Sequence, residues 1–254
     1  MANYTKLATQ KSGQAPIDLN DKIARLARFP PLILNGHWLK DGNATLFNDG
    51  RKAIIFLNGD RIPSTVSGGP LGNDKYEFHN AHFHWGENDC RGAEHTINGT
   101  WFSMECHLVH WNRKYLTFEE CLKHRDGLCI LAYLFLVQSG PCQLYNVKFE
   151  RISENLKHIQ NPGSDIKIPA NSLSWMRIAT DCPSYYTYHG SYNFYNIDFN
   201  SDCVTWIIFP AIIPIQSCQL NEFRKLKDKN GKFIKSNWRD VQLLKGRQTF
   251  LAVP

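Results

Sequence analysis

The chain has 254 residues, and its 29 Lys and Arg against 23 Asp and Glu give a formal net charge of +6 with neutral His. Hydrophobic residues make up 43%, which is enough to bury a sizeable core. No apolar run approaches the roughly 20 residues that span a bilayer, so no membrane segment is expected. The positive charge is densest at Lys225, Lys227, Lys229, Lys232 and Lys235. A solvated loop face is favoured there, and no nucleic-acid partner is expected.

The N-terminus carries no apolar stretch of the kind found in secretory signals. Eight cysteines without a CxxC pair are too sparse for a disulfide framework. Both features predict a reduced, cytoplasmic chain. Glycosylation sequons at Asn3, Asn43 and Asn98 point the other way. Secretion therefore stays open, since a signal peptide outside this sequence would be invisible.

Short β-rich runs separated by turn residues dominate the chain. In order they are Ala53–Leu57, Ala81–Trp85, Glu105–Trp111, Cys129–Val137 and Val204–Phe209. Helical periodicity is limited to Phe118–His124 and Gln219–Leu226, with a weaker case at Ser153–Ile159. No repeat or linker divides the chain. The pattern predicts a mainly β protein with a few short helices, as one domain over residues 1–254.

The run Ala81–Trp85 places His82 and His84 two residues apart. Strand residues i and i+2 point to the same face, so both imidazoles can reach one metal ion, while Phe83 faces the opposite side. By itself this pattern is a modest signal, because a strand histidine is more often a hydrogen-bonded structural residue.

The next strand pattern supplies a third histidine, His107. Three protein ligands that leave one position open are typical of a catalytic zinc site, whereas structural zinc sites are closed by four ligands. Metal-binding histidines usually donate their second N–H to an acceptor. Glu105, two residues before His107, and Asn80, two before His82, are candidate acceptors. We therefore predict one Zn²⁺ on His82, His84 and His107.

Glu94 lies between the two histidine strands. Near a zinc cavity its carboxylate can orient a hydroxyl-bearing partner. A surface turn carboxylate is an equally good reading of the spacing, and the sequence pattern leaves both open.

The segments HFHWG and GAEHTINGTWFSMECHLVHWN resemble the signature of the α-class carbonic anhydrases. Further matches follow in order along nearly the whole chain: Gln14–Asp18, Gly68–Leu71, Asp126–Leu128, Tyr186–Ser191, Cys203–Ile207 and Asn237–Arg239. The resemblance implies a single α-carbonic anhydrase-like domain, built on a large, twisted, mostly antiparallel central sheet. The zinc is expected at the base of a cone-shaped cleft.

The resemblance also implies the activity, which is the zinc-dependent, reversible hydration of carbon dioxide to bicarbonate and a proton. Glu94 matches the buried glutamate of the family. The positions that match the family's apolar substrate pocket are Val109, Ile130, Val204 and Trp206, with Tyr192 beside them. Core packing would suit the first four equally well. A monomer is expected.

Three positions depart from the family pattern. Asn193 stands where the family has a gatekeeper threonine that orients the attacking oxygen with the buried glutamate. Asn can accept and donate hydrogen bonds, but from two separate atoms. Arg51 occupies the position of the family's proton-shuttle histidine and cannot release a proton at neutral pH. Tyr192 and Phe194 are bulkier than the usual residues and are expected to narrow the cleft.

These departures keep a second function open, that of a carbonic anhydrase-related zinc-binding protein with weak or no catalysis that acts through a partner. The Tyr192–Phe194 replacement favours this alternative, whereas the complete histidine triad favours the enzyme. A zinc-stabilised structural domain is disfavoured, because no protein donor is evident for a fourth ligand. For the proton shuttle, His79 and His189 are the candidate substitutes.

Overall fold

The structure is a computed structural model that describes residues 13–138, 145–193 and 200–254. Within these residues the main sheet has 12 strands, and most neighbours are antiparallel. Phe194 lies outside the described residues, and of Asn193 only the backbone is described.

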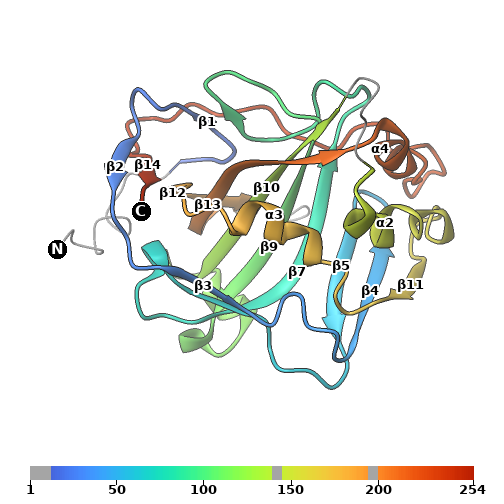
Figure 1. Cartoon of the computed structure of the whole chain (residues 1–254), viewed down its shortest axis with the longest axis horizontal. Coiled ribbons are helices and arrows are strands. Elements are labelled where there is room, and N and C mark those ends of the chain that lie inside the picture. The colour runs from blue at the N-terminus through green and yellow to red at the C-terminus, as the bar shows by residue number, and fades with distance from the viewer. Residues whose placement is uncertain (1–12, 139–144, 194–199) are drawn as a thin grey trace.

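The strands follow one another across the sheet in an order that brings distant segments together (Figure 1). That order is β11 (Asp165–Ile168), β4 (Asn43–Asn48), β5 (Ala53–Asn58), β7 (Tyr76–Trp85), β9 (Met104–Asn112), β10 (Leu128–Val137), β13 (Asn200–Ile215), β12 (Tyr185–Asn193), β14 (Phe250–Ala252) and β2 (Arg25–Ala27). β3 (Leu32–Asn35) pairs with β6 (Thr65–Gly68), which also pairs with β7. Two pairs in this sheet, β10 with β13 and β14 with β2, are parallel. β1 (Asp18–Leu19) and β8 (Thr96–Ile97) form a separate parallel pair.

The helices are short, as expected. They are α1 (Phe118–Cys121), α2 (Val147–Ser153), α3 (Arg177–Thr180) and α4 (Ser217–Arg224), with 3₁₀ turns η2 (Gly69–Leu71), η3 (Arg113–Tyr115), η4 (Leu156–His158) and η5 (Ser174–Met176). Side chains fix where they start: the Thr117 hydroxyl accepts a hydrogen bond from Glu120 N, and Gln216 forms a capping box with Gln219.

The helix predictions were right in type and less so in extent. The predicted helix at Gln219–Leu226 is α4, displaced by two residues. The predicted helix at Ser153–Ile159 is wrong. In the structure α2 ends at Ser153, and residues Leu156–His158 form the 3₁₀ turn η4. Across the described residues, no helix has the length and apolar character needed to cross a membrane.

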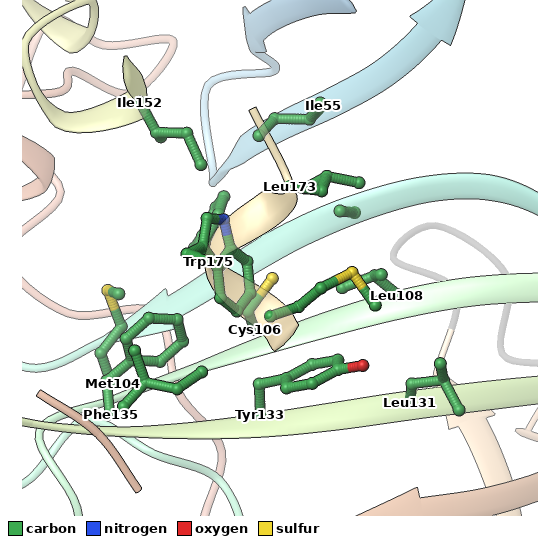
Figure 2. Close-up of a cluster of buried hydrophobic side chains, with 14 of the residues drawn as sticks. Ile55, Met104, Cys106, Leu108, Leu131, Tyr133, Phe135, Ile152, Leu173 and Trp175 are labelled. Atoms are coloured by element: carbon green, nitrogen blue, oxygen red, sulfur yellow. The ribbon is translucent and has the colours of Figure 1, made fainter. Parts of the chain in front are cut away.

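One face of the central strands carries the larger apolar core (Figure 2). Cys106 and Leu108 of β9 lie there with Tyr133 of β10, and Trp175 of η5 packs onto them. Each fully buried large side chain of this kind contributes about 1.5–3 kcal/mol to stability. The alternation of a strand then directs the intervening residues, including His107, to the opposite face.

A register shift in β7 decides which residues join His107. The pairing of β7 with β9 is irregular between Phe78 and Asn80, so His79 lies in a bulge. Beyond it the pairing is regular, and Asn80, His82 and His84 share one face. β7 and β9 thus present their histidines side by side.

Candidate metal centre

His82 and His107 face each other directly across β7 and β9, and His84 lies two residues further along β7. All three are buried. One ring nitrogen from each comes within 4.8 Å of the others, so the three can reach a common ion. The β-strand period and the cross-strand register together produce this convergence.

The second ring nitrogen of each histidine is held by an acceptor. Asn80 Oδ1 lies 2.9 Å from His82 Nδ1, and the Asn237 carbonyl lies 3.1 Å from His84 Nδ1. Glu105 Oε1 lies 2.6 Å from His107 Nε2. The nitrogens left to face inward are therefore Nε2 of His82, Nε2 of His84 and Nδ1 of His107. His84 Nε2 is buried and has no hydrogen-bond partner, an arrangement that costs free energy unless a further group binds there.

The electrostatics suit a cation that takes neutral imidazoles. Burial lowers the pKa of His82 and His84 well below the usual histidine value, and it lowers that of His107 despite the Glu105 carboxylate. All three rings are therefore neutral at pH 7, which is the state that binds a metal. Nitrogen donors in this number suit Zn²⁺.

The Glu105 carboxylate accepts four hydrogen bonds behind these ligands. Oε2 accepts hydrogen bonds from the backbone N–H groups of Glu94 and His95, at 2.9 and 2.7 Å. Oε1 accepts from His95 Nδ1 and His107 Nε2, each at 2.6 Å. His95 Nε2 in turn accepts from the Tyr188 hydroxyl at 2.8 Å. Burial by itself would raise the pKa of Glu105, but His95 and His107 outweigh it and hold this pKa well below its ordinary value.

The histidines open onto a cleft of about 360 Å³, which we call the metal cleft. Its walls include Lys52, Glu94, Tyr192, Trp206 and Trp238. Glu94 is 8% exposed, so it is not a surface turn carboxylate. Its Oε1 accepts a hydrogen bond from Arg239 N at 3.0 Å and lies 3.2 Å from His84 Nδ1. Burial and the nearby Glu105 raise the pKa of Glu94 to about 8, and a divalent cation bound beside it would oppose that rise.

Sequence comparison adds a second line of argument. The family model for eukaryotic-type carbonic anhydrases matches residues 2–252. The chain belongs to the eukaryotic-type carbonic anhydrase family. Carbonic anhydrase 3 of Bos taurus is 30% identical over 241 residues, which cover 92% of this chain and 87% of that protein. Carbonic anhydrase 3 of Rattus norvegicus is 30% identical over 239 residues, and that of Homo sapiens 28% over 240, each with the same coverage.

For a carbonic anhydrase-family chain, the predicted substrate pocket divides into two groups. Trp206 and Tyr192 line the metal cleft. Val109, Ile130 and Val204 are fully buried in the apolar cluster that contains Trp206, behind the cleft wall. The Trp206 ring lies 4.9 Å from the His107 ring, and Trp206 belongs both to this cluster and to the cleft lining.

Neither candidate substitute for the proton shuttle is among the cleft residues. His79 stacks on Phe118 at 4.1 Å, and His189 is buried beside Asp202. Neither lines the metal cleft or the hollow next to it. Arg51 lines that neighbouring hollow and not the metal cleft itself.

Sequence reasoning missed two residues that the structure brings to the centre. Asn237 reaches His84 from 153 positions away and also accepts a hydrogen bond from Trp85 N. Lys52 lines the metal cleft with the histidines. Lys52 directly precedes β5, and only the structure shows that this strand pairs with β7 at His82.

Proposed function

We propose that the chain binds one Zn²⁺ on His82, His84 and His107 and catalyses the reversible hydration of carbon dioxide to bicarbonate and a proton. One observation carries the proposal. Three neutral, buried imidazoles turn one nitrogen each toward a common point, and that point opens onto a cleft. Family membership supports the same activity.

The roles of the chain's own residues follow from their contacts. Bound Zn²⁺ acts as a Lewis acid that makes water a nucleophile near neutral pH. Glu105 keeps the proton of His107 on Nε2 and so keeps Nδ1 available as a ligand. Asn80 and the Asn237 carbonyl do the same for His82 and His84.

Carbon dioxide is apolar and needs an apolar surface. Trp206 and Tyr192 offer it at the cleft wall, backed by Val109, Ile130 and Val204. Glu94, whose carboxylate is fixed by Arg239 N, orients the attacking oxygen together with Asn193 in this proposal. Because Asn193 replaces a hydroxyl with an amide and Tyr192 is bulky, we expect a slower enzyme than the triad by itself suggests.

The test is stopped-flow measurement of carbon dioxide hydration on protein whose zinc content has been determined. One zinc per chain and a rate that disappears with zinc removal are expected, and a His107→Ala variant serves as the inactive control. Zinc at full occupancy without activity would replace the enzyme with the alternative, a zinc-binding protein that acts through a partner. Absence of zinc binding would refute both.

A further inference from the structure

Lys52 joins two hollows. It lines the metal cleft, and it also lines a neighbouring hollow of about 760 Å³, which we call the outer hollow. His84 and Trp238 are the other residues common to both, so the two spaces meet beside the predicted metal site. Arg51, Lys229 and Lys235 add further positive charge to the outer hollow.

The backbone that carries Lys52 is held in place by a tight turn. Asp49 Oδ1 accepts hydrogen bonds from the N–H groups of Arg51 and Lys52, both at 2.7 Å. Asn48 Oδ1 accepts from Gly50 N at 2.8 Å, and Gly50 has a φ of +83° that favours glycine. β5 begins at the next residue, Ala53. The turn and the strand thus fix the backbone position from which Lys52 lines both hollows.

The acidic groups near the outer hollow already have partners, and Asp49, in the turn before Lys52, accepts two backbone hydrogen bonds. Asp228 Oδ1 is occupied by the backbone N–H groups of Asn230 and Lys232 at 2.8 and 2.9 Å. Lys235 is paired with Glu87 at 3.2 Å, where both side chains are exposed and the pair is weak. Glu94 lines the metal cleft together with Lys52, and its Oε1 already accepts the hydrogen bond from Arg239 N.

We propose that Lys52 is an anion-binding residue of the metal cleft, and that its ammonium holds a small monovalent anion of the bicarbonate class against the metal site. The proposal rests on the proposed function, since the anion is the expected product. A lysine ammonium is a compact point charge suited to small oxyanions. A cleft with one sign of charge also raises the local concentration of counter-ions, so Arg51 and Lys229 would concentrate anions at its mouth.

The experiment uses protein loaded with Co²⁺ in place of Zn²⁺, with metal content determined for every sample. Titration with bicarbonate and with thiocyanate, followed by visible absorption, gives the two dissociation constants. Lys52→Met and Lys52→Gln are expected to weaken both by at least about tenfold, which is about 1.4 kcal/mol. Lys52→Arg, which keeps the charge, should stay within about threefold of the parent, a change of less than about 0.7 kcal/mol.

Two controls separate charge from damage. Lys40 is exposed and lines neither hollow, so Lys40→Met should leave both dissociation constants unchanged. Imidazole binds metal as a neutral molecule, and its affinity should change less than about twofold in the Lys52 variants, under about 0.4 kcal/mol. Lys229 lines the outer hollow but not the metal cleft, so Lys229→Met should weaken anion binding only at low salt.

The outcomes distinguish this proposal from the proposed function. Full cobalt occupancy with unchanged anion affinity in both neutral Lys52 variants would overturn the role of Lys52 and leave the metal site intact. Equal losses for imidazole and for anions would also overturn it, since the variants would then have damaged the site. If the parent binds neither cobalt nor zinc, the metal site itself is refuted, and the role of Lys52 with it.

Discussion

The Glu105→Gln variant tests whether the carboxylate behind the histidines sets their chemistry. Glu105 is fully buried and accepts four hydrogen bonds, two at each oxygen. A glutamine of the same shape has one acceptor oxygen and one NH₂ group that can only donate. All four partners of Glu105 are N–H donors. In either orientation of the glutamine amide, its NH₂ group therefore faces two N–H donors in place of an acceptor.

Each orientation has a calculable consequence. With NH₂ toward the backbone, the N–H groups of Glu94 and His95 lose their acceptor, which costs about 1–3 kcal/mol for each buried group. With NH₂ toward the rings, His107 must carry its proton on Nδ1, the nitrogen that faces the predicted metal. Loss of such a supporting partner typically weakens metal affinity by about 10- to 100-fold. We therefore expect one of two losses in the variant: zinc binding weaker by that factor, or a metal-free protein less stable by about 2–6 kcal/mol.

Zinc affinity is measured by competition with a chromophoric chelator, and stability by chemical denaturation of the metal-free protein. Glu119→Gln is the matched control, because Glu119 is exposed and the same atoms change. Zinc affinity within threefold of the parent, together with an unchanged denaturation midpoint, would refute the argument that Glu105 controls the tautomer of His107.

Four further predictions concern the metal centre and the cleft. His84→Ala should abolish tight zinc binding; zinc retained at one per chain by elemental analysis would contradict the site. Arg51→His should make carbon dioxide hydration less dependent on added imidazole-type buffer, since arginine releases no proton near neutrality; a parent rate that ignores buffer would contradict this. Asn193→Thr should raise the hydration rate, by up to about 100-fold if the amide is misplaced by about 1 Å, with zinc content as the control; an unchanged rate would point to the bulk of Tyr192 instead. Burial raises the pKa of Glu94 to about 8 from 4.5, so the metal-free folded chain keeps a proton that the unfolded chain has lost, and this contribution to stability declines as pH rises from 5 to 8. Glutamine does not titrate, so the free energy of unfolding of Glu94→Gln minus that of the parent should rise by about 3 kcal/mol between pH 5 and pH 8. The measurement is made in chelator-containing buffer. A difference that stays constant with pH would contradict the raised pKa of Glu94.

A cytoplasmic location, a monomeric state and a single domain over residues 1–254 remain predictions from the sequence. Among the described residues, the free thiols of Cys90, Cys182 and Cys218 lie outside the core. Mass spectrometry of the purified chain at known concentration would address the expected monomer.

Features that depend on short-range periodicity could be predicted before the structure was known. The alternation in Ala81–Trp85 and Glu105–Trp111 identified two neighbouring strands and assigned each histidine to a face, because side chains alternate strictly along a strand. It also placed Asn80 and Glu105 on the faces of the histidines they contact, since residues two apart share a face. Resemblance to a known family then supplied the fold and the activity to be tested.

The distant residues that complete the site could be identified only from the folded chain. The Asn237 carbonyl reaches His84, Arg239 N reaches Glu94, and Tyr188 reaches His95 through contacts that span 93 to 153 positions. No local pattern encodes such contacts, because they depend on how strands and loops pack. The same holds for Lys52, whose place between two hollows follows from a turn and a strand register together. Local spacing thus predicted the three histidines, and long-range packing set their partners, their burial and the charge beside them.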